Sequence, residues 1–162
     1  MKNKKQLDED YYKKNKEEQI TKWYSDEIWG KKIQDDNILF EVMSLQIFQA
    51  GLTWKSTLLR RDEFRVAFNG WRIEEVALFD SEKINQMLNN SSIIRNRIKI
   101  KACVKNAKII NKIKEEHNTF CNWFYNETKE NELEKLQKIM IDRFEFMGPE
   151  IARMWLMASG RI

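Results

Sequence analysis

The chain has 162 residues, of which 42% are hydrophobic and 33% charged, with a formal net charge of +4. This apolar content excludes a disordered chain, and no apolar run reaches the roughly 20 residues that a membrane-spanning helix requires. Five glycines, one proline, two cysteines and one histidine leave few signals for strands, disulfides or a structural metal site, so we expect an all-α, single compact helical domain without metal or cofactor.

The first 18 residues are mostly charged or polar, and they predict a solvated, flexible or frayed N-terminal arm. One helical domain is then expected from residue 19 to residue 162. The N-terminal residues lack the apolar core of a signal peptide, so we expect a cytoplasmic protein.

Capping residues and apolar periodicity predict a series of helices. Asp35 and Asp36 begin an apolar, buried helix that ends at Gly51, and Thr53 caps a second helix that runs to Gly70. Further helices are expected in the following segments: Ile73–Leu78, Ser81–Leu88 with Ser81 as its cap, Ile93–Ile113, Phe120–Phe124, Leu133–Ile141, and a last one that begins at Gly148-Pro149.

The positive charge is concentrated between Lys83 and Lys114, which hold nine Lys or Arg residues and no acid, so the remainder of the chain is net acidic. A solvated basic helix face is the simplest interpretation of such a segment. However, the polar turn Asn89–Ser92 precedes the predicted helix, whose free N–H groups and guanidiniums suit a phosphate. Helix, polar hairpin and helix would then hold the backbone of duplex DNA without reading its bases. The predicted contacts are Ser91, Ser92, Arg95, Asn96, Arg97 and Lys99.

Two glutamines interrupt the apolar helix that ends at Gly51. Gln46 and Gln49 lie one turn apart, and a buried amide more often bonds a backbone group than a ligand. Trp54 follows, and the upstream segment Trp23–Trp29 contains three aromatics that either pack in the core or form a stacking platform. The residues alone therefore indicate a helical nucleic-acid binder with a candidate base pocket, and they do not establish catalysis.

Ordered blocks from about residue 20 to the end are similar to those of DNA-3-methyladenine glycosylase I, a monofunctional repair enzyme of the helix-hairpin-helix superfamily. The blocks are Tyr24-Ser25-Asp26 with Trp29-Gly30, Asp35-Asp36, Leu39-Phe40-Glu41, Gln49-Ala50-Gly51-Leu52-Thr53-Trp54, Phe64–Phe68, Ile93–Arg97 with Lys99-Ile100, Asn106-Ala107, and Phe144–Pro149. The resemblance implies a helix-hairpin-helix element and a purine flipped out of double-stranded DNA onto Trp54 and Tyr24, with Leu52 as the wedge that fills the gap. It also implies a bacterial-type cytoplasmic monomer that is associated with the nucleoid when it acts.

The chain departs from the family's pattern in the pocket. Gln46 replaces the glutamate that binds the methylated base, and Thr21 replaces a second pocket tyrosine. A base methylated at N3 is cationic and leaves as a neutral molecule, so discrimination by the pocket matters more than acid catalysis. An amide keeps hydrogen bonding to an adenine edge but loses most of the charge effect. Glu41, Asp26 and Glu27 are nearby carboxylates that could replace it, and the sequence does not determine whether any of them reaches the pocket.

The family's zinc site has no counterpart in this sequence. Ser25 replaces its first histidine, the N-terminal cysteine is missing, and the chain ends at Ile162 before the last two ligands. Since zinc ties the termini together in the family, we expect looser ends. Loss of these ligands together with the second tyrosine favours natural divergence over an engineered Gln46.

The leading prediction is a DNA base-excision repair glycosylase that hydrolyses the N-glycosidic bond of 3-methyladenine or a related modified purine, with altered or reduced activity and with Gln46 at the catalytic position. The alternative is a non-catalytic protein that binds lesions or abasic sites. A helical interaction protein without a DNA role is the third.

Overall fold

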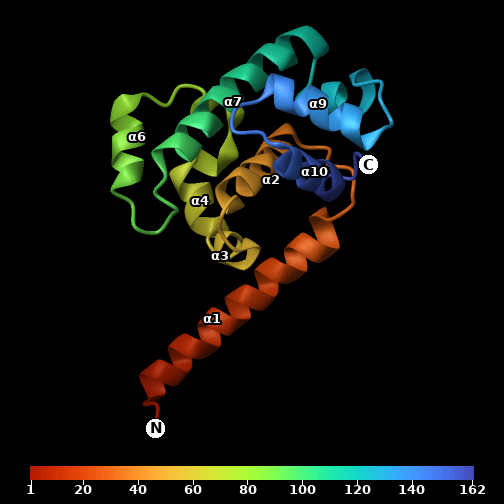
Figure 1. Cartoon of the computed structure of the whole chain (residues 1–162). Coiled ribbons are helices and arrows are strands. Elements are labelled where there is room, and N and C mark those ends of the chain that lie inside the picture. Colours follow the sequence, from red (N-terminus) through yellow and green to blue (C-terminus); the bar gives the residue numbers. More distant parts are fainter.

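The computed structural model describes residues 1–162 and is built from helices alone, which confirms the all-α prediction (Figure 1). The elements are α1 (Lys4–Trp23), the π-helical turn η1 (Tyr24–Ile28), α2 (Asp36–Gln49), α3 (Trp54–Leu58), α4 (Arg61–Ala67), the short 3-10 turn η2 (Asn69–Trp71), α5 (Ile73–Val76), α6 (Ser81–Leu88), α7 (Arg97–His117), α8 (Phe120–Asn122), the π-helical turn η3 (Trp123–Glu127), α9 (Leu133–Arg143) and α10 (Pro149–Ala158). No helix has the length and apolarity needed to span a membrane.

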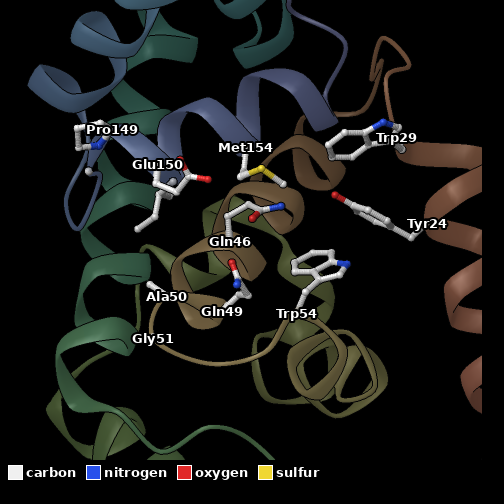
Figure 2. Close-up of a pocket in the computed structure, with 12 residues that line it drawn as sticks. Tyr24, Trp29, Gln46, Gln49, Ala50, Gly51, Trp54, Pro149, Glu150 and Met154 are labelled. Carbon is white, nitrogen blue, oxygen red and sulfur yellow. The ribbon is translucent and has the colours of Figure 1, made fainter.

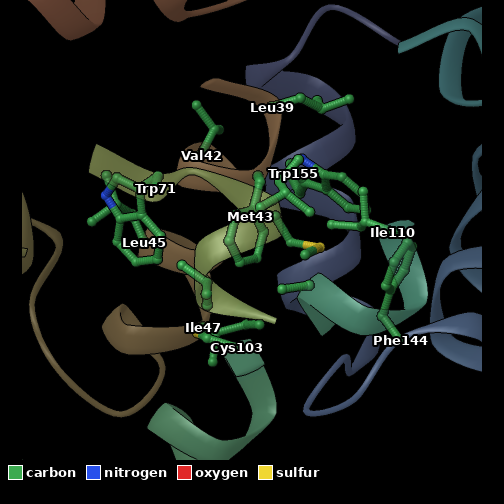
Figure 3. Close-up of a cluster of buried hydrophobic side chains, with 14 of the residues drawn as sticks. Leu39, Val42, Met43, Leu45, Ile47, Trp71, Cys103, Ile110, Phe144 and Trp155 are labelled. Atoms are coloured by element: carbon green, nitrogen blue, oxygen red, sulfur yellow. The ribbon is translucent and has the colours of Figure 1, made fainter. Parts of the chain in front are cut away.

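Helix α2 is the central element of the domain, as predicted. The Asp35 carboxylate caps it by accepting from the backbone N–H groups of Asn37 and Ile38 at 2.8 and 3.2 Å. Every residue from Leu39 to Phe48 is buried. Around α2 the core is formed by side chains from several elements, among them Trp71, Cys103, Ile110, Phe144 and Trp155 (Figure 3). This packing fixes the position of both glutamines of the helix.

The N-terminal arm is a continuous helix, so the expected boundary between residues 18 and 19 falls inside α1. The residues expected to form a flexible or frayed arm are helical, with Asn3 as the N-cap, and the helix projects away from the body (Figure 1). Its last turns are held against the domain by ion pairs of Lys16 with Glu63 at 2.8 Å and of Glu17 with Lys55 at 2.7 Å.

Several predicted helix starts differ from the observed ones. The segment from Thr53 to Gly70 is two helices, α3 and α4, rather than one. Asp80, not Ser81, caps α6, because its carboxylate accepts from the N–H of Lys83 at 2.9 Å. Helix α7 begins at Arg97 rather than at Ile93, because the extended Asn96 caps it with its side chain and Ile93 lies in the turn before it. The predicted starts of α2, α3 and α10 are confirmed.

The C-terminal residues are fastened to the body, which contradicts the expectation of loose ends at this terminus. Gly30 N–H donates to the carbonyl of Ala158 at 2.9 Å, and Gly160 packs directly on the Gly30 backbone. The Arg161 guanidinium donates to the carbonyls of Phe124, at 2.9 Å, and of Glu130, at 2.7 Å. These contacts join the end of α10 to the segment after η1.

Candidate functional site

A cavity of about 560 Å³ opens between the C-terminal half of α2, η1, α3 and the first turns of α10 (Figure 2). This volume lies within the range of roughly 300–1,000 Å³ that is usual for small-molecule sites. Its lining consists of Tyr24, Trp29, Gln46, Gln49, Ala50, Gly51, Trp54, Gly148, Pro149, Glu150, Ile151 and Met154. The structure thus brings Tyr24, Gln46 and Trp54, three of the predicted base-binding residues, to one cavity.

Aromatic side chains form one side of the cavity. The ring centroids of Tyr24 and Trp54 are 4.8 Å apart, and those of Tyr24 and Trp29 are 6.0 Å apart. Burial raises the pKa of Tyr24 to about 12, an effect that the neighbouring Gln46 amide partly offsets. Tyr24 is therefore an uncharged phenol at neutral pH, which can donate or accept a hydrogen bond. Met154 of α10 lies across the cavity from these rings (Figure 2).

The two glutamines of α2 have different roles. Gln49 donates its amide to the carbonyl of Leu52 at 3.2 Å, so it satisfies a backbone group and fixes the turn after α2. Gln46 is only 1% exposed, and its Nε2 has no well-formed hydrogen bond within the protein, although the Tyr24 hydroxyl lies close enough for the amide to lower the Tyr24 pKa. Leaving a buried amide donor unpaired costs about 1–3 kcal/mol, so its retention calls for an explanation. Because Gln46 lines the cavity, a ligand there can accept a hydrogen bond from its Nε2 (Figure 2).

Thr21, which was predicted to bind the base, does not line this cavity. It is exposed on α1, where its side chain borders a second cavity of about 340 Å³ together with Glu17, Ser25 and Lys55. Tyr24 and Trp54 line both cavities, which places Thr21 behind these rings rather than beside Gln46.

None of the carboxylates considered as a replacement for a glutamate at position 46, namely Glu41, Asp26 and Glu27, lines the cavity. Glu41 is buried, with its carboxylate 3.6 Å from Arg61 and 3.9 Å from Arg65. Burial raises the pKa of Glu41, and the two guanidiniums oppose this rise. Asp26 and Glu27 are exposed on η1. The carboxylate that does line the cavity is Glu150, which is distant in sequence from all of these residues.

The turn between α2 and α3 exposes an apolar side chain next to the cavity. Leu52 is 46% exposed, whereas the neighbouring Gly51 and Ala50 line the cavity. Lys99 holds this turn: its ammonium donates to the carbonyls of Phe48 at 2.8 Å and of Ala50 at 2.6 Å. Lys99 is only 5% exposed, so the expectation that it contacts DNA directly is wrong. It caps the C-terminal end of α2, where a positive charge is favourable.

A polar loop connects α6 to α7. Ser91, Ser92, Arg95 and Arg97 are exposed, and no protein group pairs with Arg95. Arg97 donates weakly to Asn85 of α6 at 3.3 Å, and Asn96 is engaged as the cap of α7. Because Lys99 of the same first turn reaches Ala50, this end of α7 lies beside the turn that carries Leu52.

Phe146 was missed by the sequence reasoning. It is a partly exposed aromatic with a φ of +53°, a conformation that is unfavourable for a residue with a side chain. The buried Asn106 holds the adjoining backbone by bonding both the carbonyl and the N–H of Glu145, at 3.1 and 2.7 Å. The Lys99 ammonium lies 6.0 Å from the Phe146 ring. Only the three-dimensional structure places Phe146 beside the Leu52 turn.

The residues present do not fit the zinc site that the family resemblance implies. No group of three or more His, Cys, Asp or Glu side chains converges anywhere in the structure. At the position of the expected first ligand, the Ser25 hydroxyl bonds the Lys22 carbonyl and the Asp26 carboxylate.

Comparisons with known proteins point to one family. A DNA-3-methyladenine glycosylase of Haemophilus influenzae is 40% identical over 85 residues, which is 52% of this chain and 46% of the relative. The alignment thus spans about half the length of this curated relative. A crystal structure of 3-methyladenine DNA glycosylase I has a TM-score of 0.76 at 26% identity and covers 88% of both chains.

The Staphylococcus aureus enzyme, solved to explain its recognition of 3-methyladenine, has a TM-score of 0.77 at 24% identity, covering 88% of this chain and 85% of that one. The methyladenine glycosylase family model matches residues 14–142, which is well over half of the chain and includes the helices on three sides of the cavity. The chain therefore belongs to the methyladenine glycosylase family.

Proposed function

We propose that this protein is a DNA glycosylase that flips 3-methyladenine, or a related modified purine, out of double-stranded DNA and hydrolyses its N-glycosidic bond. The observation that carries the proposal is the cavity in which the buried Gln46 keeps an unpaired Nε2 beside the Tyr24 and Trp54 rings. Membership of the family supports it. We further propose that the protein acts as a monomer in the cytoplasm, on nucleoid DNA.

The flipped base stacks on the aromatic side of the cavity. Its other face meets Ile151 and Met154, which are apolar and come from α10. The Gln46 amide can pair with an adenine edge, because an amide presents one donor and one acceptor side by side. Tyr24, neutral at neutral pH, adds one further hydrogen-bonding group. Enclosure of the base also removes water from around its charge, which strengthens each polar contact.

In the reaction, the bond between C1′ of the sugar and the base nitrogen breaks, and its electron pair goes to the base. The cationic modified base thereby leaves as a neutral molecule. A water molecule adds its oxygen to C1′ and loses a proton, and an abasic site remains. The protein's contribution is to hold the base and to stabilise the positive charge that develops on the sugar. Gln46 contributes only a dipole to this stabilisation, so we expect slower release than a carboxylate at this position would give.

DNA docking would use the face beside the cavity. Leu52 is the exposed apolar side chain that can fill the gap left in the base stack. The loop before α7, with Ser91, Ser92, Arg95 and Arg97, would contact phosphates. These two regions adjoin because Lys99 connects the first turn of α7 to the turn that carries Leu52.

The test is a base-release assay on duplex DNA treated with a methylating agent, with released bases separated and identified. We expect the wild type to release a modified purine and Gln46→Glu to release it faster. Trp54→Ala should release it about 5- to 150-fold more slowly, because base stacking on an aromatic ring contributes about 1–3 kcal/mol. If neither the wild type nor Gln46→Glu releases any base, the glycosylase proposal is wrong. Tight binding to an abasic-site analogue without release would then support the non-catalytic alternative, which the loss of the carboxylate at position 46 favours.

A further inference from the structure

The cavity has a single carboxylate in its lining, and that carboxylate is Glu150. It follows Pro149 in the first turn of α10, on the side of the cavity away from Tyr24 and Trp54 (Figure 2). The other ionisable group in the lining is Tyr24, which is uncharged at neutral pH. Any preference of the cavity for a cation over a neutral molecule of the same shape must therefore depend chiefly on Glu150.

We propose that Glu150 attracts the cationic modified base into the cavity and so supplies, from α10, the negative charge that Gln46 does not provide. The inference rests on the proposed function, since it concerns how that substrate is selected. A unit negative charge at the cavity mouth lowers the energy of a cationic base and leaves that of an unmodified, neutral base almost unchanged. Charge selection of this kind would be added to the hydrogen bonding of the Gln46 amide.

Arg153 weakens this attraction because its positive charge lies beside the Glu150 carboxylate. Its guanidinium grips the Glu150 carboxylate in a two-point pair, with Nη2 to Oε1 at 2.6 Å and Nε to Oε2 at 3.1 Å. The pair lies one helical turn apart at the surface, where such pairs are weak and exchange with other partners. A cationic base can therefore share the Glu150 carboxylate with Arg153. Removing Arg153 should strengthen the attraction, and removing the Glu150 charge should weaken it.

The experiment compares binding of 1-methyladenosine, a nucleoside that is cationic at neutral pH, with binding of neutral adenosine. Trp29 and Trp54 line the cavity, so quenching of tryptophan fluorescence reports binding without any need for turnover. The variants are Glu150→Gln and Arg153→Gln. The matched control is Glu75→Gln, because Glu75 forms the same one-turn pair with Arg72, at 2.7 Å, but does not line the cavity.

We expect the wild type to bind the cation more tightly than adenosine and Glu150→Gln to reduce this preference about threefold, as for a partly exposed charge pair. Arg153→Gln should increase the preference, and Glu75→Gln should leave it unchanged. Adding Gln46→Glu to the Glu150→Gln variant should restore the preference, since it returns a negative charge to the same cavity.

The inference is overturned if Glu150→Gln keeps the wild-type preference, if Glu75→Gln loses as much, if Gln46→Glu restores nothing, or if the wild type binds neither nucleoside. These outcomes are separate from those of the proposed function, which depends on base release from methylated DNA by the wild type. Release of modified bases combined with an unchanged preference in Glu150→Gln would keep the glycosylase and remove the role of Glu150.

Discussion

Substituting Gly160 tests whether the contact between the chain's C-terminal end and Gly30 holds the fold together. Gly160 has a φ of +65°, and a Cβ added there would lie 2.8 Å from the Gly30 carbonyl oxygen and 2.8 Å from the Lys31 carbonyl carbon. Both neighbours are backbone atoms, which cannot turn aside as a flexible side chain would. Gly160→Ala therefore combines left-handed backbone strain of about 1–2 kcal/mol with overpacking of about 1–3 kcal/mol, so we expect a loss of roughly 2–5 kcal/mol.

The control is Gly70→Ala, because Gly70 has a similar φ of +68° but nothing within 4 Å of the added Cβ. Its cost should be the strain alone, about 1–2 kcal/mol. Urea unfolding measures both variants, and for a domain of this size each kcal/mol should also lower the thermal midpoint by about 2–4 °C. If Gly160→Ala is no less stable than Gly70→Ala, the contact with Gly30 does not constrain the fold and the reasoning is refuted.

Three further variants test the turn that carries Leu52, the loop before α7 and the aromatic side of the cavity. Lys99→Met removes two charge-assisted hydrogen bonds, so urea unfolding should show a loss of about 1.5–3 kcal/mol for each bond. Base release should also slow because the turn bearing Leu52 loosens, and unchanged stability would refute this role. Arg95→Gln should weaken DNA binding equally for all sequences and reduce the slope of log affinity against log salt by about 0.9; an unaltered slope would mean that Arg95 contacts no phosphate. Because burial raises the pKa of Tyr24 to about 12, above the unfolded value of 10.0, its contribution to stability is complete below pH 10 and declines as the pH rises towards 12. Tyr24→Phe should flatten this decline in urea unfolding, and an unchanged alkaline profile would contradict the assignment.

The helix ends that could be predicted from the sequence are those set by local chemistry. Asp35 and Thr53 cap α2 and α3 with their own side chains, and Pro149 begins α10, so each signal lies within three residues of the structure it forms. The start of α7 could not be predicted in this way. Ile93 continues the apolar pattern because it packs in the core, yet it lies in the turn before the helix, and Asn96 provides the actual cap.

The residues of the site likewise fall into those that could be predicted from the sequence and those that could not. Tyr24, Gln46 and Trp54 could be assigned to one cavity because the family resemblance links them, and Gln46 and Trp54 are also close in sequence. The direction of a long side chain could not be predicted: Lys99 belongs to a basic segment, but its ammonium turns inward to the end of α2. Glu150 could not be predicted either, since it meets Gln46 only after α10 has packed against α2.

The structure gives a physical reason why an amide is tolerated at position 46. No cation lies beside Gln46, and the two guanidiniums of Arg61 and Arg65 already pair with the buried Glu41. A carboxylate at position 46 would therefore be buried without a partner in the empty cavity, which costs several kcal/mol unless it takes up a proton. That cost would be recovered only when a cationic base enters. With Gln46 the protein without ligand has a smaller desolvation cost. The charge that distinguishes a methylated base must then come from an element other than α2. Glu150 of α10 can provide it, because its carboxylate is exposed to water and stays ionised at little cost. Placing the charge at the cavity mouth thus exchanges strength of attraction for stability of the unliganded fold.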